Sequence, residues 1–200
     1  MQVDNNFSVF DNGVDNLNWP LPFPYSTSPQ LLGEASTDAT LFSHSTRHPT
    51  TLVIIPRPDN GSPTPRKYAS VPAIDFWVEG RQGLRLIDAL QGNFAGLAGP
   101  GHEVMNAVST KVSYKVEWIG YKPLSKQKYA RRVKGRQSRS KIARQVAEIV
   151  SEFVNDRARC QTSQPLWRIG RGSIEYANLY LMEIKRVSKS TWVPVLAYAV

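Results

Sequence analysis

Apolar and polar side chains alternate most regularly in residues 110–119, whose sequence is TKVSYKVEWI. Successive side chains of an extended chain point to opposite faces, so this alternation predicts a β-strand with one buried and one solvent-facing side. The positions expected to be buried are Val112, Tyr114, Val116 and Trp118. Residues 120–125 can turn the chain into a second, strongly basic strand at 126–133, and the two strands then form a hairpin.

Residues 138–154 have the spacing of an amphipathic helix. Their apolar side chains fall at positions i, i+4, i+7, i+11 and i+12, which share one face of a helix. These side chains are Ile142, Val146, Ile149, Phe153 and Val154, with Ala143 and Ala147 beside them. Ser138 or Ser140 can cap the first turn, because a serine hydroxyl accepts a hydrogen bond from a free backbone N–H group.

Shorter apolar runs predict the remaining elements. Strands are expected at 73–78, 166–169, 179–187 and 192–198, and a strand edge with a short helix is expected after Gly83. The glycine-rich residues 92–101 lack the Gly-Lys-Ser/Thr ending of a phosphate-binding loop and indicate an ordinary loop. Together these elements predict an α+β fold, in which one principal amphipathic helix packs on a small, mostly antiparallel sheet.

The first third of the chain has a different composition. Of the 14 prolines, 10 lie at or before Pro72, and Ser, Thr, Asn and Gly interrupt every apolar pattern there. Such a segment cannot bury enough apolar surface to offset its conformational entropy. The expected organisation is therefore a disordered acidic and aromatic, Pro/Ser/Thr-rich tail at 1–70 and a basic α+β domain at 71–200.

The charge is concentrated in the predicted domain. The whole chain has a net charge of +9, whereas residues 71–200 hold 21 Lys and Arg against 10 Asp and Glu. Ten of these cations lie between Lys122 and Arg144, and no carboxylate occurs between Glu117 and Glu148. A basic segment of this density is typical of a contact surface for nucleic acid or another polyanion. It is also typical of an import signal, or of a charged face that only meets solvent.

The candidate anion-binding residues follow from this segment. They are Lys126, Lys128, Arg131, Arg132, Lys134, Arg136, Arg139, Lys141 and Arg144, with Tyr121 as an aromatic ring that could stack on a base or sugar. Several of these cations crowd the start of the predicted helix, where free N–H groups already favour anions. The helix start is therefore a candidate site for a phosphate.

Two stretches of the tail have features of their own. Carboxylates and aromatic side chains interleave over residues 4–25, and Trp19, Phe23 and Tyr25 could bind a protein partner. Thr64, followed by proline and two cations, resembles a site for a proline-directed kinase.

Enzyme chemistry has little support in the sequence. His44 and His48 have the spacing of a helical metal pair, but their surroundings are not helical in composition and offer no third ligand. Cys160 lies beside Arg157 and Arg159, which could lower its thiol pKa, but no partner histidine is discernible. We expect no catalytic residues, no metal and no cofactor.

Targeting signals are equally sparse. The first basic residue is Arg47, no run approaches the roughly 18 apolar residues of a spanning helix, and a single cysteine fits a reducing compartment. The sequence therefore predicts a soluble nuclear or cytoplasmic protein without a membrane partner.

Two resemblances add to this interpretation. Five motifs, in their order along the chain, resemble a large family of uncharacterised proteins from mushroom-forming fungi. They are Leu86–Leu90, Trp118–Pro123, Ile142–Ala147, Trp167–Gly170 and Val187–Pro194. The resemblance implies a disordered N-terminal region before a compact C-terminal domain, and no particular activity. Residues 114–121 also partly resemble the strand of a chromodomain, a family that binds methylated lysine in an aromatic cage.

Taken together, the sequence predicts a non-enzymatic intracellular binding protein whose basic domain contacts an anionic partner. Nucleic acid is the favoured partner, because the cations form one dense segment. The alternative is a protein-interaction adaptor, whose positive surface binds an acidic protein while the aromatic tail binds another.

Overall fold

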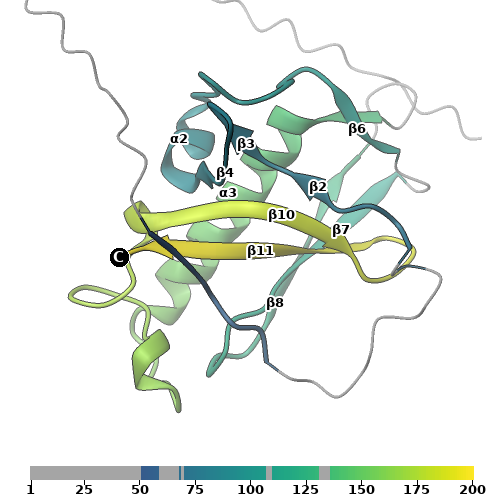
Figure 1. Cartoon of the computed structure of the whole chain (residues 1–200). Helices are drawn as coiled ribbons and strands as arrows, with labels where there is room; N and C mark the ends of the chain where they lie inside the picture. The colour runs from purple at the N-terminus through teal and green to yellow at the C-terminus, as the bar shows by residue number, and fades with distance from the viewer. Residues whose placement is uncertain (1–50, 59–67, 69, 107–109, 131–135) are drawn as a thin grey trace, which may run out of the picture. The chain divides into compact units, whose positions relative to one another are not determined.

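The computed structural model describes residues 51–58, 68, 70–106, 110–130 and 136–200 (Figure 1). All of them belong to one compact unit, Thr46–Val200. The tail segment 1–50, with Trp19, Phe23, Tyr25, His44 and His48, lies outside the described residues, and so does Thr64.

A seven-stranded sheet forms the centre of this unit. Its main path runs β2 (Ile74–Asp75), β10 (Leu179–Arg186), β11 (Thr191–Ala199), β7 (Lys111–Val116) and β8 (Leu124–Tyr129). Two short strands join at its sides: β1 (Leu52–Ile54) pairs with β11, and β5 (Leu84–Arg85) pairs with β10. All pairings are antiparallel except that between β11 and β7.

The predicted hairpin is confirmed, but its second strand, expected at 126–133, spans Leu124–Tyr129, and residues 131–133 lie outside the described residues. β7 and β8 pair in antiparallel register from Lys111 opposite Tyr129 to Val116 opposite Leu124. The four side chains expected on the buried face of the first strand are each at most 2% exposed. Gly120 has a φ of 82° in the connecting turn, a conformation that is strained for residues with a Cβ atom.

Helix α3 (Arg139–Arg157) lies across one face of the sheet (Figure 1). The hydroxyl of its N-cap residue, Ser138, accepts a hydrogen bond from the Lys141 N–H group, so the first of the two expected caps is the one used. All seven apolar side chains expected on its inner face are buried. Phe153 packs against Trp118 with ring centroids 6.1 Å apart, which joins helix and hairpin in one core. The predicted α+β class is therefore confirmed.

The remaining elements lie at the edges of this core. Helix α2 (Leu86–Gln91) packs beside α3 after β5, as the pattern following Gly83 predicts. Two further pairs of strands form small separate sheets. They are β3 (Trp77–Val78) with β4 (Arg81–Gln82), and β6 (Glu103–Asn106) with β9 (Arg136–Ser138).

Two expected strands differ in the structure. Residues 166–169 were expected to be extended, but Pro165–Trp167 forms the 3₁₀ helix η1. The fixed φ of Pro165 favours a helical first position, and the Trp167 carbonyl accepts a hydrogen bond from Trp118 Nε1 at 2.8 Å. The predicted strand at 73–78 is divided at Phe76, because β2 pairs with β10 whereas β3 turns back onto β4.

The boundary expected after residue 70 also requires correction. Leu52–Ile54 falls in the segment predicted to be disordered, yet it forms β1, opposite residues 197–199 of β11. Leu52–Ile54 is extended because it pairs with β11, a long strand from the other end of the chain. The local sequence pattern does not predict such a distant partner. Ile55 is 3% exposed and belongs to the core.

No helix in the described part of the chain is long and apolar enough to cross a membrane.

Candidate functional site

The two basic residues of β8 face carboxylates of α3. Lys126 Nζ lies 2.6 Å from Glu152 Oε1, and Lys128 Nζ lies 2.8 Å from Glu148 Oε2. The hydrogen bond and the charge of Glu152 raise the pKa of Lys126. These carboxylates come 20 or more residues later in the chain, and the crossing of α3 over the sheet brings them to β8. Both lysines therefore neutralise carboxylates of their own domain.

Two further candidate cations are paired in the same way. Arg144 Nε lies 3.7 Å from Glu148 Oε1, one turn along the helix, and Arg136 Nη1 lies 3.0 Å from Glu103 Oε2 on the neighbouring strand. The carboxylate-free run between Glu117 and Glu148 is thus a property of the sequence only. In space, carboxylates reach these four cations from α3 and β6.

The start of α3 is already capped. The N–H group of Arg139 donates to the carbonyl of His102, and that of Ser140 donates to the carbonyl of Pro100, each at 3.0 Å. The third N–H group, of Lys141, donates to the Ser138 hydroxyl. A phosphate at this helix start would need the same donors, so the geometry does not support the phosphate site suggested by the sequence.

Tyr121 does not offer its ring to a base. The residue is 7% exposed, and its ring packs edge-on against Phe153. Its hydroxyl accepts a hydrogen bond from the Ile169 N–H group at 3.0 Å. The expectation that Tyr121 stacks on a nucleotide is therefore corrected: the polar neighbours in its sequence lie on a turn, while its own side chain joins the core.

The other candidate residues differ in position. Arg131, Arg132 and Lys134 lie outside the described residues. Lys141 is partly exposed and forms no ion pair with any carboxylate that the structure describes. Arg139 donates from Nη1 to the carbonyls of Ala98 and Gly99.

A second group of cations lies at the other end of α3, and we call it the C-terminal basic cluster. Its members are Lys122, Arg159, Arg168 and Arg171, all of them exposed. None of them forms an ion pair within the described ranges of the chain. The cluster is thus a set of cations that its own domain leaves without carboxylate partners.

Three segments bring this cluster together. Arg157, in the last turn of α3, donates to the Lys122 carbonyl at 3.4 Å and stacks over Phe153. Gly170 packs against Ala158, so the loop that carries Arg168 and Arg171 lies beside the helix end. Arg168 is held in that loop, because its carbonyl accepts a hydrogen bond from the Ile174 N–H group.

The carboxylates nearest to the cluster in sequence have other partners. Asp156 contributes to the raised pKa of Lys126, after the larger effect of Glu152. Glu175 accepts a hydrogen bond from the Gly172 N–H group at 3.2 Å. Lys122 begins the basic run of the sequence, but Arg159, Arg168 and Arg171 are scattered beyond that run, so no charge run reveals the cluster as a whole.

Metal binding and thiol chemistry have little support in the described residues. They contain no group of three or more His, Cys, Asp or Glu residues that could hold a metal ion. Cys160 is exposed, and its thiol donates a hydrogen bond to the Asp156 carbonyl at 3.4 Å.

Comparison with protein-family models, with curated proteins and with solved structures found no match to this chain.

Proposed function

We propose that this chain is a non-enzymatic binding protein whose basic α+β domain binds nucleic acid through the C-terminal basic cluster. The observation that carries the proposal is that Lys122, Arg159, Arg168 and Arg171 are exposed and make no ion pair with a described carboxylate. A phosphate backbone supplies the regularly spaced negative charges that such a surface lacks.

The composition of the cluster favours phosphate as the contacted group. Three of its four members are arginines, whose planar guanidinium groups donate two parallel hydrogen bonds to phosphate oxygens. Tyr121 belongs to the core and does not stack on a base beside them. Contacts to phosphates alone position a protein without reading sequence, so the proposed binding is independent of base sequence.

The experiment measures binding of the full chain to a short fluorescent DNA duplex, and to the matching RNA duplex, by fluorescence anisotropy. One variant changes the four cluster cations to glutamine. A matched variant changes the four paired cations, Lys126, Lys128, Arg136 and Arg144, to glutamine and so removes the same formal charge. We expect the cluster variant to bind about tenfold or more weakly, and the matched variant to lose less affinity.

Three outcomes would overturn the proposal. Equal losses in the two variants would mean that net charge alone attracts the duplex. Absence of binding by the unchanged full chain at low salt would favour the adaptor that binds an acidic protein. Loss of binding only on changing Arg131, Arg132 and Lys134 would move the contact to that segment.

A nuclear site of action belongs to the same proposal. Residues 126–141 are rich in the cations that are typical of nuclear import signals, and this composition supports the proposed location. We also propose that the chain is related to the proteins of mushroom-forming fungi that its motifs resemble. That resemblance implies no particular activity.

A further inference from the structure

A cavity lies beside the first residue of α3. Its volume is about 410 Å³, which falls within the usual range of about 300–1,000 Å³ for small-molecule sites. Strands β2 and β6 and the adjoining ends of β10 and β11 complete its wall. The lining residues are Val71, Pro72, Ala73, Ile74, Asp75, Val104, Met105, Arg139, Arg186 and Trp192.

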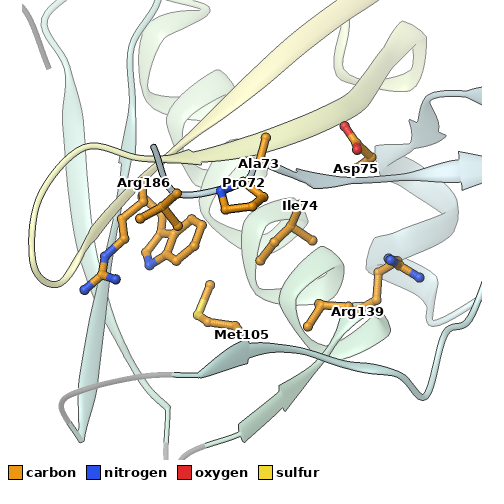
Figure 2. Close-up of a pocket in the computed structure, with 10 residues that line it drawn as sticks. Pro72, Ala73, Ile74, Asp75, Met105, Arg139 and Arg186 are labelled. Carbon is orange, nitrogen blue, oxygen red and sulfur yellow. The ribbon is translucent and has the colours of Figure 1, made fainter. Parts of the chain in front are cut away.

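The walls of this cavity are apolar and its ends are cationic. Figure 2 shows Ile74 and Met105 in the middle, with Arg139 and Arg186 on opposite sides of them. Trp192 adds a large aromatic surface that is 7% exposed. An elongated apolar molecule with a polar group at one end fits such a lining.

The polar groups at the ends are mainly donors. Arg139 Nε is buried and has no hydrogen-bond partner among the described residues, although Nη1 of the same guanidinium group binds the carbonyls of Ala98 and Gly99. Arg139 is a lining residue, so its guanidinium charge lies at this end of the cavity and favours a negatively charged group of a bound molecule.

The charge balance at the cavity is positive. Arg186 donates to the carbonyls of Ser188 and Lys189 and stacks over Tyr68, and none of these groups carries a negative charge. Asp75 is the single acidic residue of the lining, and it accepts a hydrogen bond from Gln82 at 3.3 Å. Two guanidinium groups against one carboxylate favour an anionic molecule.

We propose that this cavity binds a small organic acid, with an acyl or aryl body against Ile74, Met105 and Trp192 and its acidic group at Arg139. This ligand site goes beyond the proposed nucleic-acid function. Arg139 begins α3 and the C-terminal basic cluster surrounds its end, about 28 Å along a helix of 19 residues. The two sites can therefore be changed separately.

The test uses 8-anilinonaphthalene-1-sulfonate, an aromatic acid whose fluorescence rises in apolar surroundings, with the intact chain. Arg139→Gln removes the charged donor, and Ile74→Trp enlarges a side chain that lies in the middle of the cavity. Arg136→Gln is the control, since Arg136 lies close in sequence but pairs with Glu103. We expect about tenfold weaker binding for the first two variants and no change for the control, with circular dichroism confirming that each variant folds.

Competition by decanoate and by 1-decanol identifies the recognised chemistry. Decanoate should displace the probe from the unchanged chain, whereas the alcohol of equal chain length should displace it much less well. Equal displacement by both compounds, or unchanged probe binding in Arg139→Gln and Ile74→Trp, would overturn the proposal. Duplex binding by Arg139→Gln should remain at the level of the unchanged chain, which keeps this result separate from the nucleic-acid proposal.

Discussion

Lysine and arginine side chains of this domain act according to the groups that face them. Lys126 and Lys128 reach carboxylates of α3 at 2.6 and 2.8 Å and attach a strand to a helix. Arg168 and Arg171 have the same formal charge but project from a loop, exposed and without a described carboxylate partner. The sequence does not distinguish these two kinds of cation. Only the fold shows which cations are paired with carboxylates and which are available to a ligand.

Buried tyrosines make the domain sensitive to alkaline pH. Burial raises the pKa of Tyr114 and of Tyr176 above the ordinary value of 10.0. In the unfolded chain these phenols ionise near pH 10, whereas in the folded chain they stay neutral to higher pH. Their stabilising contribution is therefore complete below pH 10 and decreases as the pH rises above it, by about 1.4 kcal/mol per pH unit for Tyr114.

The measurement is the free energy of unfolding in urea at neutral pH and at several values above pH 10. Tyr114→Phe is the control: its stability should start lower, because the hydroxyl donates to Gln137 and lies 3.2 Å from Gln145 Oε1, and should then fall less steeply. Identical alkaline slopes for the two chains would contradict the role of Tyr114.

At the scale of elements, ion pairs hold the last strand of the sheet's main path against α3. Among the described strands, β8 pairs with β7 alone, and its two lysines extend to Glu148 and Glu152. Lysines on such a strand also discourage pairing with other chains. The basic segment found in the sequence therefore has a structural role in this region.

A double-mutant cycle tests that role. Lys128→Gln and Glu148→Gln, separately and together, should give a coupling free energy of about 0.2–1 kcal/mol that decreases with added salt, since both side chains are partly exposed. Lys122→Gln with Glu148→Gln is the matched control and should show no coupling. Equal coupling in the two cycles would mean that general charge effects, and no specific pair, stabilise the contact.

Elements with a strong local pattern could be predicted from the sequence. The alternation over residues 110–119 and the helical spacing from Ile142 to Val154 each lie within one element, and both predictions are confirmed. Partners from distant segments could not be predicted. Leu52–Ile54 is a strand because β11 lies beside it, and Tyr121 is buried because α3 brings Phe153 to its ring. The pairing of Lys128 with Glu148 depends on the same crossing of α3 over the sheet.

At the scale of the whole chain, the net charge of +9 includes cations in different settings. Those of β8 and β9 and Arg144 of α3 are paired with carboxylates, whereas four cations around the end of α3 form the C-terminal basic cluster. The cavity at the start of α3 is a separate feature with an apolar lining. The central claim is that the cluster, and not the charge of the chain as a whole, binds phosphates.

The salt dependence of duplex binding by the full chain tests this claim most directly. A contact to Z phosphates lowers the logarithm of affinity by about 0.9Z per logarithmic unit of salt, so four contacts predict a slope of about −3 to −4. Each change of a cluster cation to glutamine should make this slope shallower by about 1, while Lys128→Gln should leave it nearly unchanged. A slope near zero for the unchanged chain, or one that the cluster variants do not alter, would contradict the claim.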